Sequence, residues 1–403
     1  MKTADPELVR AINRYHVIDA IRRDGPISRV EIAGRTELSR ATVSAITGGL
    51  IEEGLIGVVR VEAPEGARGR PRVLLQVRGE ACHVAGVKLS AHRLGVTVTD
   101  ARGEPLGSLV MPIRLARQPP DVIADLVEDG VRQCAADAGV RVADLWGVGV
   151  GLPGVVDAVA GVSHWSPILG AAPVPFGREV ARRLGTRVLV ENDATLVALA
   201  EHWFGGRDPA TLAVVTIEDG IGMGLVLDGR IHRGAHGIGP EFGHVKADPA
   251  GPPCRCGQRG CLDAYASDWG ILRQALARGA VEAVEDGAGP GQLAELVRRA
   301  RAGEGVPAGL FHRAGEALGL AIANAINLLN PPRLVISGEG LRAGDLLRLP
   351  LLAAVEANVL PTLREATEIV FQPWGDEMWA RGAAAIVLRQ VYEAPWEAPW
   401  GAA

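Results

Sequence analysis

Residues 239–261 read G-P-E-F-G-H-V-K-A-D-P-A-G-P-P-C-R-C-G-Q-R-G-C and contain three of the chain's five cysteines. Cys254, Cys256 and Cys261 fall within eight positions, and His244 precedes the first of them by ten residues. Three thiolates and one imidazole are a ligand set that holds tetrahedral zinc, and the glycines between the thiols allow the tight turns of a knuckle. We therefore predict a zinc site built from these four side chains.

Two alternatives to zinc exist for the cysteine cluster. A disulfide is disfavoured in a chain that shows no secretory segment, and free buried thiols have no reason to cluster. With four protein ligands the zinc would have no open coordination position. The predicted site is therefore structural and does not generate hydroxide.

Length and composition predict a folded protein of more than one domain. A chain of 403 residues exceeds a single ordinary core. Its hydrophobic content of 48% and charged content of 22% are typical of soluble proteins, and no apolar run approaches a membrane span. We expect a cytoplasmic protein. The net charge of −5 divides into +2 for residues 1–75 (12 Lys+Arg, 10 Asp+Glu) and −7 for the remainder (30 and 37). Only the amino-terminal part leans towards nucleic acid.

The first 75 residues predict three helices. Apolar residues recur at helical spacing over 8–21, and D-G-P at 24–26 ends that helix. Ser28 with Glu31 three residues later forms a capping box, which predicts a second helix from Ser28. A similar pattern starts a third helix at Ser39.

Two short helices in this order have the helix-turn-helix layout, in which the second helix lays its first turns in the major groove of DNA. Its outward positions carry small or hydrogen-bonding groups: Ser39, Arg40, Ala41, Thr42 and Ser44. Such groups allow close approach to base edges, and Arg40 can reach a guanine or a phosphate. These five residues are the predicted base-reading set.

A hairpin follows the three helices. Residues 55–61 and 73–77 are predicted strands around a loop at 64–72, which is the layout of a wing. The loop carries Arg68, Arg70 and Arg72, and these suit a phosphate or a minor groove. The alternative is a small protein-interaction module with a solvated linker. DNA binding is favoured because motif order, spacing and basic wing agree.

The rest of the chain predicts two α/β lobes. From His83 onward short apolar strands alternate with helices, which implies ligands at the carboxyl ends of strands, between the lobes. We assign residues 1–77 to the winged helix and 78–403 to the two-lobed part. The lobe boundary is expected near 204–210, with a carboxy-terminal helix returning to the first lobe.

Four strings make the likeness to a known family specific. They are V-E-N-D-A at 190–194, D-G-I-G-M-G-L-V-L-D-G-R-I at 219–231, G-P-E-F-G-H at 239–244 and C-R-C-G-Q-R-G-C-L-D at 254–263. Together they resemble the ROK family (repressors, open reading frames, kinases). The resemblance implies a two-lobed sugar-kinase fold of the actin and hexokinase type, which is ribonuclease H-like. It covers essentially the whole chain, since ROK repressors carry a winged helix before the kinase-like part.

The resemblance also implies site residues. Asn192 and Asp193 match the family's sugar-binding asparagine and catalytic aspartate, while Glu241 and His244 match its sugar-hydroxyl ligands, with His244 also on zinc. Asp263 stands where family members usually have glutamate, and its shorter arm is expected to miss a hydroxyl. Taken alone, Asp193 is equally an Asx turn or a helix cap.

The nucleotide site of the family is not matched in the same way. ROK kinases hold ATP phosphates with an aspartate-x-glycine-glycine-threonine turn after the first strand, and this chain has K-L-S-A-H at 88–92. A second glycine-rich turn is preceded by Glu218 and Asp219, which would repel a polyphosphate. Gly338 and Gly340 fit the family's nucleoside-side turn or an ordinary strand exit.

These observations predict a DNA-binding regulator, a repressor of carbohydrate genes, which is controlled by a sugar or sugar phosphate. It would bind an operator with an inverted repeat as a homodimer, and Asp193 would be a vestigial base in a chain that is not an enzyme. The alternative is a ROK-type sugar kinase that also binds DNA. A pure interaction scaffold is disfavoured, because the polar residues of the pocket survive together.

Overall fold

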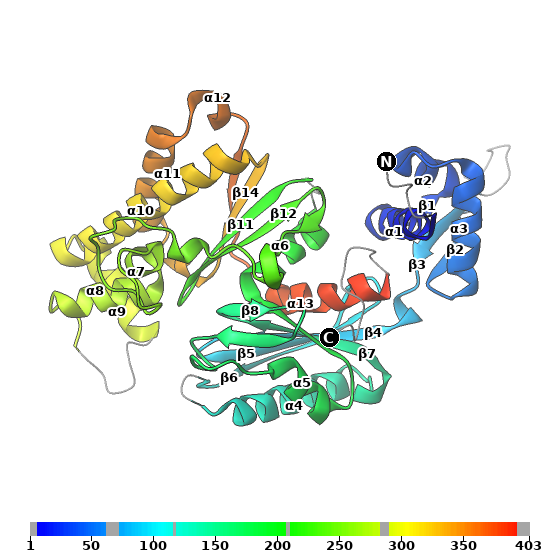
Figure 1. Ribbon diagram of the computed structural model, residues 1–403, viewed down its shortest axis with the longest axis horizontal. Helices are drawn as coiled ribbons and strands as arrows, with labels where there is room; N and C mark the ends of the chain where they lie inside the picture. The colour runs from blue at the N-terminus through cyan, green and yellow to red at the C-terminus, as the bar shows by residue number, and fades with distance from the viewer. Residues whose placement is uncertain (1–5, 62–71, 116–117, 207–209, 283–289, 393–403) are drawn as a thin grey trace. The chain divides into compact units, whose positions relative to one another are not determined.

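The computed structural model describes residues 6–61, 72–115, 118–206, 210–282 and 290–392 (Figure 1). The chain divides into two compact units. The first holds the residues up to Glu191 together with those from Trp379 onward, and the second holds Asn192–Met378. The chain therefore passes between the units twice.

The amino-terminal part of the first unit is a winged helix. Its elements are α1 (Pro6–Asp24), β1 (Ile27–Ser28), α2 (Arg29–Thr36), α3 (Arg40–Glu52), β2 (Ile56–Val61) and β3 (Arg72–Val77). The strands form a sheet in the order β1-β3-β2. Ser28 caps α2 in a complete capping box with Glu31, and the Ser39 side chain accepts from the Thr42 backbone N–H, so both predicted helix starts are confirmed.

The remainder of the first unit is a five-stranded mixed sheet with helices on it. The strands are β4 (His83–Leu89), β5 (Arg93–Asp100), β6 (Pro105–Pro112), β7 (Leu145–Leu152) and β10 (Val188–Asn192), in the order β10-β7-β4-β5-β6. A separate hairpin joins β8 (Val155–Asp157) to β9 (Val162–Trp165), and the helices are α4 (Pro120–Asp137), α5 (Phe176–Leu184) and α13 (Asp376–Val391).

Helix α13 packs on the sheet through two glycines. A Cβ on Gly86 of β4 would overlap the Ala380 carbonyl oxygen, and one on Gly149 of β7 would overlap that of Ala383. Beyond its last turn, the Tyr392 hydroxyl donates to the Ala101 carbonyl at 2.5 Å. Arg14 of α1 donates to the Tyr392 carbonyl at 3.3 Å. The carboxy-terminal helix therefore runs from the second chain crossing to the first helix of the winged helix.

The second unit is also a five-stranded sheet with helices. Its strands are β11 (Leu212–Ile217), β12 (Ile221–Leu227), β13 (Arg230–Ile231), β14 (Arg333–Ser337) and β15 (Glu368–Phe371), in the order β13-β12-β11-β14-β15. Its helices are α6 (Asp193–Phe204), α7 (Leu262–Ala266), α8 (Asp268–Ala277), α9 (Pro290–Arg301), α10 (Gly305–Leu329), α11 (Asp345–Asn358) and α12 (Pro361–Arg364).

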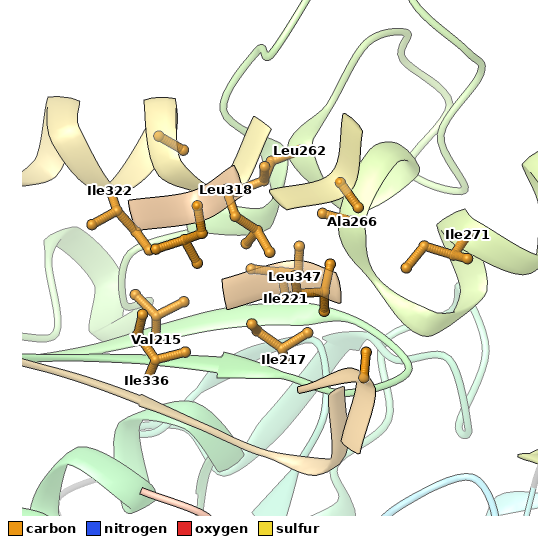
Figure 2. Close-up of a cluster of buried hydrophobic side chains, with 14 of the residues drawn as sticks. Val215, Ile217, Ile221, Leu262, Ala266, Ile271, Leu318, Ile322, Ile336 and Leu347 are labelled. Atoms are coloured by element: carbon orange, nitrogen blue, oxygen red, sulfur yellow. The ribbon is translucent and has the colours of Figure 1, made fainter. Parts of the chain in front are cut away.

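The main core of this unit lies between one face of its sheet and the long helices. Figure 2 shows Val215 and Ile336 of the sheet beneath Leu318 and Ile322 of α10. Helix α6 packs through Ala194 on Gly222 and Gly224 of β12, where added Cβ atoms would collide. Helix α6 thus belongs to the second unit, although the sequence pattern placed it at the end of the first lobe.

None of the helices within the described ranges combines the length and the apolar character needed to cross a bilayer.

Candidate ligand pocket and metal centre

The amino-terminus of α6 positions the first two predicted pocket residues. Asn192 is the helix cap, and its Oδ1 accepts from the Thr195 backbone N–H at 3.1 Å. Asp193 is the first helical residue, and its Oδ1 accepts from the backbone N–H of Ala194 at 2.8 Å. The capping function therefore belongs to Asn192, while Asp193 is held in place beside it.

Glu241 and His244 lie at the two ends of one short turn. The 3-10 helix Phe242–His244 begins directly after Glu241, and the His244 backbone N–H donates to the Glu241 carbonyl at 3.0 Å. Phe242 is buried in the core, and a Cβ on Gly243 would overlap the carbonyl oxygen of Ile221. The glycine and the buried ring fix this turn against the start of β12.

The structure brings Asp193, Glu241 and Asp263 close enough to interact electrostatically. Glu241 is exposed as a whole residue, yet the chain around its carboxylate withdraws water from that group. This desolvation, followed by the negative charges of Asp193 and Asp263, raises the pKa of Glu241 to about 7. A carboxyl that titrates near neutrality inside a polar cluster is typical of a functional site.

Asp263 is already engaged by the protein. Its Oδ1 accepts from the Ile221 backbone N–H at 3.0 Å, and its Oδ2 accepts from Nε of Arg255 at 3.2 Å. Arg255 also binds Asp219, through Nη1 to the carboxylate at 2.6 Å and through Nη2 to the carbonyl at 2.9 Å. Arg255 was not among the site residues predicted from the sequence. The acidic pair at 218–219, which the family pattern does not explain, is the signal that could have pointed to a nearby cation.

The four predicted metal ligands come together. The ligand atoms of His244, Cys254, Cys256 and Cys261 all lie within 4.8 Å of one another. Nδ1 of His244 is 3.8 Å from Sγ of Cys254, and Sγ of Cys256 is 3.7 Å from Sγ of Cys261. A tetrahedral zinc with bonds of about 2.3 Å to sulfur has ligands about 3.8 Å apart. The donor set and its spacing fit such an ion.

The local chain favours metal binding by these thiols. All five cysteines lie within the described ranges and are free. Left-handed backbone at Gly257 and Gly260, with φ of 86° and 68°, folds the chain around the cluster. Nζ of Lys246 lies 3.0 Å from Sγ of Cys261. Burial raises the pKa of Cys254 to about 12, so metal binding there would release a proton.

The turn at 88–92 contains a buried cation. The Lys88 side chain is 4% exposed, and its Nζ lies 3.7 Å from the centroid of the Trp379 ring. Ser90 closes the hairpin through its backbone N–H to the Arg93 carbonyl at 2.9 Å, and His92 is exposed.

Packing accounts for Gly222 and Gly224 of the second glycine-rich turn and for Gly338 of the separate turn at 338–340. Gly222 and Gly224 admit α6, as described above, and Gly338, with φ of 103°, lies against the carbonyl of Ile217. Gly220 differs, because its Cβ would lie 2.7 Å from Nη2 of Arg255. This turn is thus in close contact with the arginine.

The predicted base-reading residues lie at the start of α3. Arg40, Ala41 and Ser44 are exposed, and Thr42 is half-buried with its hydroxyl 2.8 Å from that of Ser39. Of the wing residues, Arg68 and Arg70 fall outside the described residues, and Arg72 opens β3.

A winged helix joined to a two-lobed α/β part with a cluster of acidic side chains and a metal-ligand cluster defines a class, the regulators and kinases built on the sugar-kinase fold. Residues 84–390 match the sequence model of the ROK family, and residues 10–56 match that of the winged helix-turn-helix DNA-binding family. The chain belongs to the ROK family.

Three similar proteins represent both branches of the class. The DNA-binding transcriptional dual regulator NagC of Escherichia coli is 30% identical over 387 residues, which is 95% of this chain and 94% of NagC. A glucokinase of Thermotoga maritima is 36% identical over 252 residues, covering 60% of this chain and 80% of the kinase. The crystal structure of a ROK family transcriptional regulator, a homologue of the E. coli MLC protein, superposes with a TM-score of 0.77 at 28% identity, covering 96% of this chain and 97% of that one.

Proposed function

We propose that this protein is a sugar-controlled transcriptional repressor. The observation that carries the proposal is the presence, in one chain, of a winged helix with an exposed reading helix and a polar pocket of the sugar-kinase type. The relatives that this chain matches over nearly their whole length are described as a transcriptional regulator and as a putative repressor. The match to the glucokinase covers only 60% of this chain.

The pocket has the chemistry that sugar recognition needs. The Asp193 and Glu241 carboxylates offer fixed acceptors to hydroxyl groups, and the amide of Asn192 can donate and accept. His244 would face the sugar from a ring whose other nitrogen is held on the metal, which fixes its orientation. We assign zinc to the Cys3His cluster because softness, number and spacing of the ligands suit that ion.

Phosphoryl transfer is the weaker alternative. The turn that would cradle ATP phosphates has Lys88 buried against Trp379 and side chains where glycines would leave space. In the second glycine-rich turn, Arg255 lies on Gly220. Asp193, which matches the family's catalytic aspartate, is retained, and this residue is the argument for a kinase activity. We assign the chain to the non-enzymatic branch because the residues at the phosphate cradle depart from the kinase pattern while the sugar ligands do not.

Control of DNA binding needs a connection between pocket and reading helix. Helix α13 supplies a candidate, since its first turn contains the crossing between Met378 and Trp379 and the residue after its last turn bonds to Arg14 of α1. We propose a homodimer on an inverted repeat in the cytoplasm, in which ligand binding changes the spacing of the two winged helices.

The test is an electrophoretic and calorimetric screen of the full chain on DNA from its own gene neighbourhood, with a panel of sugars and sugar phosphates. We expect one DNA segment to be retained and one ligand class to change its affinity. A parallel assay for sugar-dependent ADP release with ATP and Mg²⁺ should give only background. Turnover that Asp193→Asn abolishes would establish the kinase alternative instead.

A further inference from the structure

One corner of the pocket does not have the polarity that the family pattern implies. The family pattern implies a carboxylate here that accepts a hydrogen bond from a sugar hydroxyl, and the shorter arm of Asp263 was expected to miss it; the Asp263 side chain is only 3% exposed. Both of its oxygens already accept bonds, from the Ile221 backbone and from Arg255. A carboxylate that is buried and engaged in this way offers little to a ligand.

Arg255 covers the carboxylate and is more open, with 17% of its side chain exposed. Its bonds to Asp263 and Asp219 use three of the five N–H groups of a guanidinium, and the described residues take up no others. Its central carbon also lies 5.1 Å from the centroid of the Trp269 ring. The arginine is therefore held rigidly and still has two donors to give.

The place of Arg255 in the chain adds to this rigidity. It lies between Cys254 and Cys256, two members of the metal-ligand cluster, so a bound metal fixes its backbone on both sides. The contact with Gly220 sets the guanidinium directly on the turn at 218–220. At this corner the group offered to a ligand is therefore the fixed donor Arg255 and not the acceptor Asp263.

Charge decides which kind of acceptor the donor selects. The positive charge of Arg255 is opposed by two carboxylates, Asp219 and Asp263, so the three groups together carry −1. Asp193 and Glu241 stand close enough to add further negative charge. A phosphate gains little from a guanidinium that is already paired and is repelled by the surrounding carboxylates. A neutral carbonyl oxygen accepts the same hydrogen bonds without that repulsion.

We propose that Arg255 is the specificity-determining residue of this pocket and that it selects an uncharged sugar with an oxygen acceptor, such as the carbonyl of an acylated amine, over a sugar phosphate. This inference rests on the proposed function as a sugar sensor.

The experiment uses the full-length, zinc-loaded protein and four probes: glucose, N-acetylglucosamine and the 6-phosphate of each. Affinities are measured by calorimetry for the parent, Arg255→Ala, Arg255→Lys and the matched control Arg259→Ala. Arg259 is exposed in the same knuckle and has no side-chain partner among the described residues. Zinc content is measured in every variant, so that a lost metal is separated from a lost contact.

We expect the parent to bind each uncharged probe at least tenfold more tightly than its phosphate. In Arg255→Ala the affinity ratio of N-acetylglucosamine to glucose should fall about tenfold, because one donor is lost and Asp263 is freed to accept from a hydroxyl. Arg255→Lys keeps the positive charge but lacks the planar guanidinium, so its affinity ratio should lie between those of the parent protein and Arg255→Ala. Arg259→Ala should have the same ratio as the parent protein. If Arg255→Ala loses zinc, the lysine variant carries the test.

Two results would overturn the inference while leaving the sensor intact. In the first, the affinities of all bound probes fall by one common factor in the Arg255 variants, which would mean that the arginine has only a structural role. In the second, a phosphate binds more tightly than its parent sugar. Failure of all four probes to bind would overturn the inference, whereas the proposed function fails only if the wider panel of sugars and sugar phosphates leaves operator affinity unchanged.

Discussion

The pocket and the reading helix treat their polar side chains in opposite ways. In the pocket, Asp263, Arg255 and Asp219 bind one another before any ligand arrives. At the start of α3, the polar side chains of Arg40 and Ser44 are exposed to solvent. A pocket for a small neutral ligand gains selectivity from groups fixed in advance. A helix that searches many DNA sites gains from side chains that settle only on the correct bases.

The metal cluster gives the largest expected effect on this contrast. Cys256→Ser should lower the zinc content from about one per chain towards none, because a three-ligand remnant loses most of the roughly 10 to 16 kcal/mol typical of structural zinc. His244 and Arg255 would then lose their anchor, and sugar affinity should fall about 10- to 100-fold. Operator binding without ligand should change little.

Metal analysis, calorimetry and DNA retention on the same preparation check this. Cys82→Ser is the control, since Cys82 lies in the first unit and outside the cluster. A metal-free variant that binds sugar normally would show that the cluster and the pocket are independent.

The contrast also explains how far the sequence could predict the structure. Helix caps at Ser28 and Ser39 and the Cys3His cluster depend on residues close together in the chain, and they were predicted correctly. The Arg255–Asp219 contact joins residues 36 positions apart, and the acidic pair at 218–219 could have pointed to a nearby cation without identifying it. Helix α6 is buried over nearly all of its length, so its pattern did not tell which sheet it covers.

Arg40 gives the next largest effect, on the DNA side. Arg40→Ala should reduce discrimination between operator and random DNA by about 1 to 3 kcal/mol if the side chain reads a base. Binding of sugar should be unaffected. Competition binding with operator and scrambled DNA measures the difference.

Glu52→Ala, at the far end of α3, is a matched control, since it is exposed and distant from the first turn. Equal loss on both DNA sequences in Arg40→Ala would indicate a phosphate contact, and no loss on either would remove α3 as the reading helix.

The cap of α2 offers a smaller effect on stability. Ser28→Ala removes the acceptor for the Glu31 backbone N–H, which lies 3.3 Å from the hydroxyl, and should lower the stability of the winged helix by about 1 kcal/mol. Thermal unfolding should show the loss in a transition that sugar does not shift. Ser28→Asp restores a capping acceptor and should recover most of it. If serine and alanine gave the same transition, the capping box would contribute nothing to this domain.

The last effect concerns pH and the pocket side of the contrast. Glu241 has a pKa raised to about 7, first by desolvation and then by Asp193 and Asp263, so its ionised fraction rises from about one tenth at pH 6 to about nine tenths at pH 8. Only the ionised carboxylate is purely an acceptor for sugar hydroxyls, and protonation replaces one acceptor site with a donor. Sugar affinity should therefore increase as pH rises, by up to about tenfold between pH 6 and pH 8, because the binding-competent fraction increases by that factor. A carboxyl with its ordinary pKa would be fully ionised throughout and would give no slope.

Glu241→Gln should bind sugar more weakly at pH 8 and lose most of the pH dependence, and any slope left in that variant reports on His244 and the metal. Calorimetry at four pH values on zinc-loaded protein decides the matter. An affinity for sugar that stays level from pH 6 to pH 8 in the parent would mean that the ligand does not contact the Glu241 carboxylate.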